Sequence, residues 1–157
     1  MPNMPDYAYN GARVLVELHA AEMRKFVTTW REAQAAAVAL PETSDPSYAS
    51  HEELLRHVVR AARGYMTWMC SVLGLPDPGI EPVPEADVLP DQLDAYLGHV
   101  LDGWREPLAG VAPERFDEEH KARWKVTYCV DSMLEHAVMH PIRHRVQLEA
   151  LMGRSIG

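Results

Sequence analysis

The spacing of apolar residues is the feature that most constrains what this chain can fold into. Four stretches, at about residues 9–40, 50–74, 90–108 and 127–152, repeat apolar side chains every three or four positions. No stretch longer than a few residues alternates apolar and polar side chains as a strand would. A chain of 157 residues is long enough for one domain around a single core. We therefore expect an all-α fold, a four-helix bundle in which residues 1–157 form a single domain.

The second stretch carries recognisable signals at both of its ends. Ser50 and Glu53 have the spacing of a capping box, in which a hydroxyl and a carboxylate each bind one of the free amides of the first helical turn. At the other end Gly74 is followed closely by Pro76, a combination typical of a helix stop. The segment that follows, residues 76–90, contains five prolines and is long enough to run from one end of a bundle to the other. We expect it to be a crossover connection between the second and third helices.

The last connection, residues 110–125, contains two side chains that are usually buried, Phe116 and Trp124. We expect this segment to pack against the helices as a lid.

Three histidines recur at intervals of four within the fourth stretch, in Glu135-His-Ala-Val-Met-His-Pro-Ile-Arg-His144. Residues four apart lie on nearly the same side of a helix, so His136, His140 and His144 form one slowly turning stripe. The same side of the helix carries apolar residues: Met133, Ala137, Leu148 and Leu151. The histidines therefore point inward, where an unpaired imidazole costs free energy. Either hydrogen bonds or a metal ion must offset that cost.

Two imidazoles four residues apart can bind one ion, which is the spacing that zinc-binding HExxH helices use. A third ligand must then come from another helix. The candidates are His19, His51, His57, His99 and His120. The pattern places His99 on the polar side of its helix and His120 in a charged run, so we expect both at the surface, and it does not decide between His51 and His57. His19 shares the inward side of the first helix, close to Glu22. Pro141, inside the stripe, lacks an amide to bind the carbonyl of Ala137 and predicts a kink.

Two motifs resemble one known family. "HPIRHRVQL" (residues 140–148) resembles the HxxxHRGQ(I/L) signature on the last helix of the DinB-like (DinB/YfiT) bundles, except that Val146 stands where the signature has glycine. "ELLRHVVRAARGYMTWMCSVLG" (residues 53–74) resembles the second helix of that family, which opens with its first ligand histidine. The resemblance implies a four-helix bundle with a long connection between helices two and three. It also implies a divalent metal bound by His57, His140 and His144.

The resemblance further implies a class of reaction. Members of the wider superfamily are metal-dependent transferases and isomerases that use low-molecular-weight thiols such as bacillithiol or mycothiol. We accordingly expect a transferase or hydrolase with zinc, nickel or iron, a thiol as possible co-substrate, and a small-molecule substrate. Side chains that could orient the ligands or touch the substrate are His136, Gln147, His19, Glu22 and Arg143. The resemblance also suggests a homodimer.

Two non-enzymatic hypotheses compete with this one. In the first, the bundle binds a small apolar ligand in a pocket lined by Met66, Met69, Met133 and Trp104. In the second, it is a homodimeric structural protein whose interface uses exposed aromatic residues: Tyr65, Trp68 and Tyr96. A stoichiometric metal ion would disfavour both.

Composition excludes several other functions. The formal net charge of −8 and the scattered basic residues argue against a nucleic-acid-binding surface. No run approaches the roughly 20 apolar residues of a membrane span. The first residues lack the basic start and apolar core of a signal peptide. The two cysteines, Cys70 and Cys129, are far apart, so the default expectation is a reducing cytoplasm without disulfides.

Overall fold

The computed structural model describes residues 3–122 and 124–156 of the chain. Within these ranges the regular structure is mainly helical, as predicted. In chain order the elements are α1 (Asn10–Ala35), η1 (Pro46–Tyr48), α2 (His51–Val72), α3 (Leu89–Gly103), η2 (Pro113–Asp117), β1 (Glu119–Lys121), β2 (Thr127–Cys129) and α4 (Val130–Leu151). The four α-helices correspond to the four periodic stretches, although α1 ends several residues before the predicted end at residue 40.

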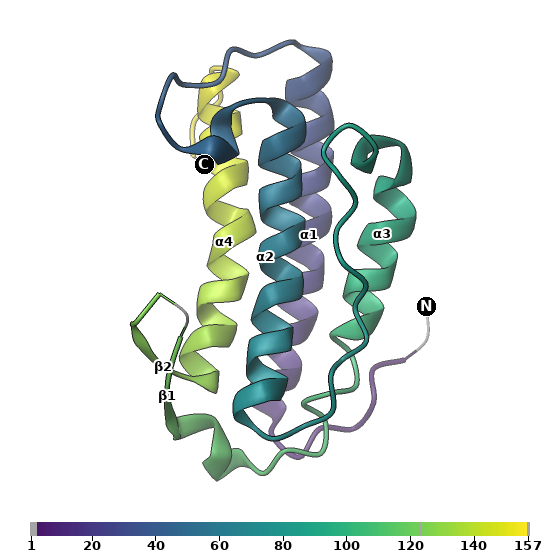
Figure 1. The fold of residues 1–157 in the computed structure, drawn as a ribbon, viewed down its shortest axis with the longest axis vertical. Coiled ribbons are helices and arrows are strands. Elements are labelled where there is room, and N and C mark those ends of the chain that lie inside the picture. Colours follow the sequence, from purple (N-terminus) through teal and green to yellow (C-terminus); the bar gives the residue numbers. More distant parts are fainter. Residues whose placement is uncertain (1–2, 123, 157) are drawn as a thin grey trace.

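Three long helices, α1, α2 and α4, lie side by side along the long axis of the molecule, and the shorter α3 lies on the side away from α4 (Figure 1). Helix α2 runs in the direction opposite to α1 and α4 (Figure 1). The segment 73–88 then runs back along α2, so that α3 begins near the end of the molecule where α2 begins (Figure 1).

Packing and hydrogen bonds explain why the segment between α2 and α3 is ordered. Ile80 and Val83 are buried. The Nε group of Arg63 donates a hydrogen bond to the carbonyl oxygen of Ile80 at 2.7 Å. The backbone amide of Glu81 donates to Nε2 of His99 at 2.9 Å. His99 is half-buried, so it is less exposed than predicted, and its ring holds this segment to α3.

The four residues named for a possible apolar ligand pocket lie in the core. Met66, Met69 and Met133 are fully buried, and Trp104 is 1% exposed. The indole nitrogen of Trp104 donates to the carbonyl oxygen of Ala62 at 3.0 Å. These side chains pack between the helices and belong to the hydrophobic core.

Two of the three aromatic residues considered for a dimer interface are also in the core. Tyr65 and Tyr96 are buried, and only Trp68 is half-exposed. The periodicity placed these side chains at the edges of their helices, where the neighbouring helices and the segment 73–88 cover them.

Side-chain caps start α2 and α4. The hydroxyl of Ser50 accepts a hydrogen bond from the amide of Glu53 at 3.0 Å, as predicted, whereas the described hydrogen bonds contain no return bond from the Glu53 carboxylate. A reciprocal capping box is found instead at α4. There the amide of Ser132 donates to the sulfur of Cys129, and the Ser132 hydroxyl accepts from the Cys129 amide. Helix α4 continues through Pro141, which is buried; the predicted kink stays a prediction.

The connection before α4 folds over the end of the helices. Strands β1 and β2 pair antiparallel, with His120 opposite Tyr128. Phe116 is 1% exposed, as predicted, but Trp124 is 47% exposed, so only part of the segment is buried.

No helix in the described ranges is both long enough and apolar enough to span a membrane.

Candidate metal centre

Three histidines from two antiparallel helices meet between α2 and α4. They are His57 of α2 and His140 and His144 of α4, and one potential ligand nitrogen from each lies within 4.8 Å of the others. The ring centres are 4.7 to 5.2 Å apart. His140 and His144 are buried and His57 is half-buried. The structure thus brings together the pair that the four-residue spacing predicted and the third histidine that the family resemblance implied.

The nitrogens of this cluster have too few hydrogen-bond partners. Nε2 of His57 and Nε2 of His140 lie 3.0 Å apart, so in a neutral pair one nitrogen must donate and the other accept. Nε2 of His144 is buried and has no hydrogen-bond partner among the residues that the structure describes. Such a nitrogen loses its hydration without compensation, which costs free energy. A bound cation would remove this cost, and three imidazoles are a ligand set that suits a divalent transition metal.

Burial keeps the three imidazoles neutral, which is the form that can bind a metal. Removal from water lowers the pKa of His140 to about 2 and that of His144 to about 4, with smaller contributions from the neighbouring histidines and from Arg143. Burial also lowers the pKa of His57, against the attraction of Asp45. The cluster therefore presents lone pairs, not positive charge, at neutral pH.

A tyrosine that the sequence reasoning missed orients His144. The hydroxyl of Tyr48, in η1, donates to Oε1 of Gln147 at 2.7 Å, and its oxygen lies 3.4 Å from Nδ1 of His144. Because the hydroxyl proton is donated to Gln147, the Tyr48 oxygen can accept a hydrogen bond from the Nδ1–H group of His144. Nε2 of His144 is then the unprotonated nitrogen and faces the cluster. Gln147 contacts both residues: it accepts from Tyr48, and its side chain also hydrogen-bonds His144, which raises the pKa of His144 against the effect of burial.

The other predicted helper residues have different places. His136 is half-buried one turn before His140 and contacts the aromatic rings of Tyr65, Tyr128 and Trp124 with centres 5.4 to 6.1 Å away. Arg143 is exposed at the edge of the cluster.

His19 and Glu22 lie apart from the three histidines. His19 is 1% exposed and stacks on Trp104, with ring centres 3.7 Å apart. Within the described part of the chain, neither of its ring nitrogens has a hydrogen-bond partner. Glu22 accepts from Lys25 at 2.9 Å and pairs with Arg145 at 3.5 Å. Neither side chain is among those that contact His57, His140 or His144, so neither has the predicted ligand-orienting contact.

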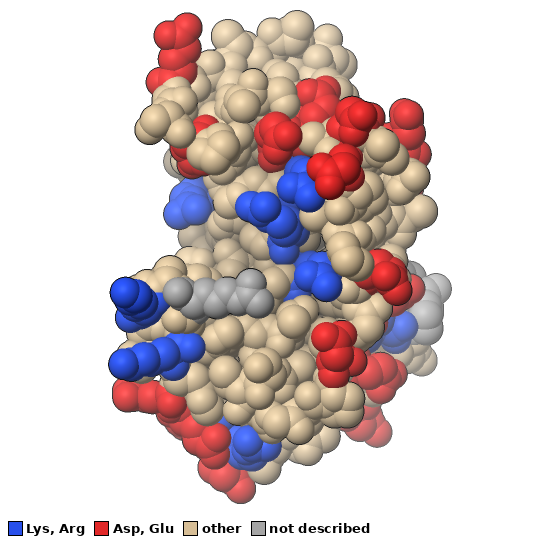
Figure 2. Space-filling view, in the orientation of Figure 1, with Lys and Arg blue, Asp and Glu red and all other residues tan. Residues whose placement is uncertain are grey.

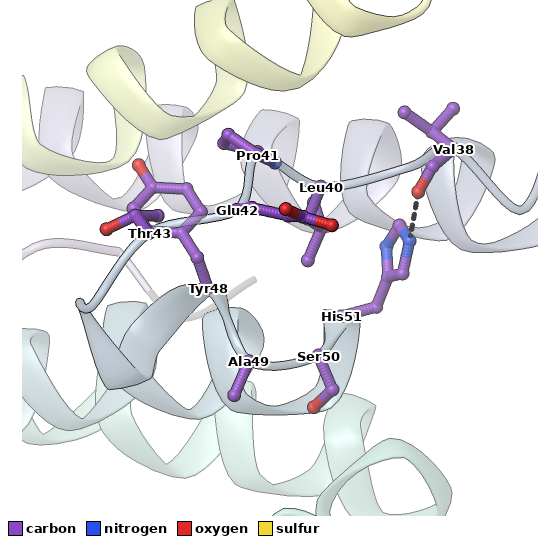
Figure 3. Close-up of a pocket in the computed structure, with 9 residues that line it drawn as sticks. All are labelled: Val38, Leu40, Pro41, Glu42, Thr43, Tyr48, Ala49, Ser50 and His51. Atoms are coloured by element: carbon purple, nitrogen blue, oxygen red, sulfur yellow. Dashed lines mark hydrogen bonds between the residues drawn. The ribbon is translucent and has the colours of Figure 1, made fainter.

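The structure also decides between His51 and His57. His51 begins α2, and its Nε2 group donates to the carbonyl oxygen of Val38 at 2.8 Å, beside a small pocket that Tyr48 also lines (Figure 3). That bond ties the start of α2 to the end of α1 and directs the ring away from His140 and His144. His120, in β1, is half-buried and lies 4.0 Å from Glu118, so it is less exposed than predicted.

The three histidines open onto a pocket of about 1060 Å³ between α2 and α4. Its lining includes residues that sequence reasoning did not select: Asp45, Tyr48, Arg60, Gly64, Trp68 and Trp124. A signal existed for part of this set, because Arg60, Gly64 and Trp68 follow His57 at helical spacing on one side of α2. No comparable signal existed for Tyr48 and Trp124, which lie in connections.

In comparison with known proteins, the chain matches no family model, no curated protein and no solved structure.

Proposed function

We propose that this protein is a divalent-metal-dependent enzyme whose metal is held by His57, His140 and His144. Zinc, nickel and iron all suit nitrogen ligands. The observation that carries the proposal is the convergence of three neutral imidazoles, one with a buried unpaired Nε2, at the wall of a large pocket. A structural metal site is usually closed by four protein ligands, whereas three ligands leave a position for water or substrate.

The proposal includes membership of the DinB-like bundles, with their four-helix topology and crossover connection. Its support is the pair of sequence motifs, together with the course of the segment 73–88 back along α2 (Figure 1). In this reading the reaction is a transfer or hydrolysis of a small molecule, with a low-molecular-weight thiol as co-substrate.

A divalent ion at such a site supplies Lewis acidity, which lowers the pKa of a water or thiol ligand toward neutrality. The protein's own residues prepare the site for that ion. Tyr48 and Gln147 hold the proton of His144 on Nδ1 and so fix the direction of its free nitrogen. Burial and the charge of Arg143 keep the imidazoles unprotonated. Burial raises the pKa of Tyr65 beside the site to about 12, so its hydroxyl keeps its proton.

The test is metal content and metal-linked stability of the protein purified without a histidine tag. We expect near one equivalent of a transition metal in the wild type and little in the triple variant His57→Ala/His140→Ala/His144→Ala. A ligand that binds only the folded state stabilises it by about 2.7 kcal/mol at a concentration one hundred times its Kd. Added metal should therefore raise the melting temperature of the chelator-treated wild type and leave that of the triple variant unchanged.

His51→Ala is the matched control, because it removes a histidine of α2 that points away from the cluster. It should retain the metal of the wild type. If the wild type holds no metal and added metal does not change its melting temperature, the histidines are core residues and the proposal is wrong. If instead the wild type holds the metal, the next step is a screen of thiol-dependent transfer reactions. The homodimer and the cytoplasmic location stay predictions.

A further inference from the structure

The large pocket is a groove whose two ends differ in chemistry. His57, Arg60, Gly64 and Trp68 line it from α2, in that order along the helix. Because α4 runs antiparallel to α2, His144 lies opposite His57 and His136 lies opposite Tyr65. One end thus holds the three histidines, and the other holds indole and phenol rings.

Two arginines beside the histidine end have no hydrogen-bond or ion-pair partner within the part of the chain that is described. Arg60 and Arg143 line the groove, are exposed, and make no hydrogen bond or ion pair there. Six other arginines are paired with carboxylates: Arg13, Arg31, Arg56, Arg115, Arg145 and Arg154. Arg24 also lacks such a bond but does not line the groove.

In a chain with a net charge of −8, unpaired cations at a pocket are notable because carboxylates are abundant elsewhere. Figure 2 shows basic side chains gathered around a hollow over α2 and α4, with acidic side chains above and below it. One carboxylate, Asp45, does line the groove, at the histidine end beside Tyr48. Beside the histidines, Arg60 and Arg143 therefore offer guanidinium groups that can bind a carboxylate through two parallel hydrogen bonds.

The opposite end offers exposed aromatic surface. Trp124 is 47% exposed, and its ring centre is 6.1 Å from that of His136. Trp68 is half-buried, and its indole nitrogen donates to the carbonyl oxygen of Lys121 at 3.4 Å. That bond holds the β1–β2 hairpin against α2 beside the groove. Flat apolar groups bind well to such rings.

A glycine on α2 keeps the middle of the groove open. Gly64 lies inside a helix, where glycine is less favourable than alanine by about 0.5–1 kcal/mol. A Cβ atom built on it would meet no atom within 4 Å, and its backbone does not have the positive φ that favours glycine. The protein's own packing therefore gives no reason for glycine there, but the residue lines the groove, where a side chain would take up ligand space.

We propose that the groove binds an aromatic or otherwise flat carboxylate, with its carboxylate between Arg60 and Arg143 and its body over Gly64 against Trp68 and Trp124. This names a substrate class for the proposed enzyme and so rests on the proposed function for its chemical use. The binding itself needs only the groove. The volume of about 1060 Å³ leaves room for a second small molecule beside the histidines.

The experiment measures binding of 2-naphthoate and of uncharged 2-naphthamide to chelator-treated protein by calorimetry and tryptophan fluorescence. Trp68 and Trp124 line the groove while Trp30 and Trp104 are buried in the core, so a change in fluorescence on ligand binding reports mainly on the groove. We expect naphthoate to bind more tightly than naphthamide. Arg60→Gln and Arg143→Gln should each weaken naphthoate binding roughly tenfold and leave naphthamide binding unchanged. Arg24→Gln is the matched control and should change neither.

Gly64→Ala is an independent test. It should raise the melting temperature, because alanine favours a helix, and weaken the binding of both probes, because its side chain takes up space in the groove. The inference is overturned if naphthoate does not bind at about millimolar concentration. It is also overturned if the double variant, with Arg60→Gln and Arg143→Gln together, binds naphthoate as tightly as the wild type. It is equally overturned if naphthoate binds only to metal-loaded protein, because the metal and not the arginines would then hold the carboxylate. Naphthoate binding to a protein that takes up no metal would support the inference and contradict the proposed function.

Discussion

At the scale of single residues, buried histidines in this chain fall into two environments. His140 and His144 face other imidazoles and a pocket, so a cation can reach their nitrogens. His19 faces the indole of Trp104 and has no polar partner. Apolar periodicity predicted that all three point inward, but periodicity does not show what an inward side chain meets.

His19 should therefore lower the stability of the protein. We expect His19→Leu to raise the free energy of unfolding at neutral pH by about 1–3 kcal/mol, because it removes unsatisfied buried polar atoms. Burial lowers the pKa of His19 to about 3 in the folded protein, below its ordinary value of 6.5. The unfolded chain therefore binds a proton there that the folded protein does not, and stability is lost as the pH falls from about 6.5 toward 3.

Urea denaturation at several pH values from neutral to acidic would measure both effects. The fall in stability with acid should be shallower in His19→Leu than in the wild type. His19→Gln is the control: it removes the titration but keeps a polar group, so it should flatten the pH dependence without the gain at neutral pH. Equal pH dependence in all three proteins would contradict the burial argument.

Tyr48 should matter for metal affinity more than for folding. Tyr48→Phe keeps the ring but removes the oxygen that lies between Gln147 and His144. Loss of a group that orients a ligand typically lowers metal affinity 10–100-fold. We expect an affinity loss in that range with a nearly unchanged melting temperature of the metal-free protein. Competition with a chromophoric chelator measures the affinity, and an unchanged value would show that Tyr48 does not orient His144.

At the scale of elements, the connection between α2 and α3 is held by close packing on α3. A Cβ atom added at Gly103, the last residue of α3, would lie 2.5 Å from Cγ1 and 2.9 Å from Cδ1 of Ile80. Ile80 is 3% exposed and has little freedom to move away. The absence of a side chain at residue 103 is therefore what allows the segment to pass this close to the helix.

Gly103→Ala should destabilise the protein by about 1–3 kcal/mol, as other overpacked sites do. Ile80→Ala removes the colliding atoms, so Gly103→Ala should cost clearly less in that background. A double-mutant cycle from chemical denaturation measures the coupling. Gly98→Ala is the matched control on the same helix, where an added Cβ meets nothing within 4 Å. Gly98→Ala should raise the free energy of unfolding by about 0.5–1 kcal/mol. If Gly103→Ala costs the same in the wild type as in the Ile80→Ala background, the close contact between residues 103 and 80 is ruled out.

At the scale of the whole molecule, the candidate metal centre joins α2 and α4, and neither α1 nor α3 contributes any of its three histidines. His57 lies on α2 and the other two ligand candidates lie on α4, while α3 packs on α2 and contributes none of the three. A metal should therefore suppress local opening of α2 and α4 without suppressing local opening of α3.

Hydrogen exchange followed by mass spectrometry, with and without metal, would test this. Amides that exchange only through global unfolding should slow equally everywhere, by the amount that binding stabilises the fold. Amides that exchange through local opening should slow in α2 and α4 near the histidines and not in α3. The triple histidine variant should show no change on addition of metal. Protection centred on α3 would place the metal elsewhere.

The amino-acid sequence by itself determined the four helices, their approximate ends, and the inward placement of His140 and His144. Those properties depend on residues within a few positions of one another, through the 3.6-residue period and the capping side chains. The long proline-rich segment also predicted a connection able to span the bundle.

Only the tertiary structure decided which residues meet those histidines. It placed His57 beside them and bound His51 to Val38, although both lie on the same helix. It brought Tyr48 from a connection to His144. Within the described residues it left Arg60 and Arg143 unpaired at the groove while pairing six other arginines with carboxylates. These contacts join residues far apart in the chain, so they depend on how the helices pack, which local periodicity does not specify.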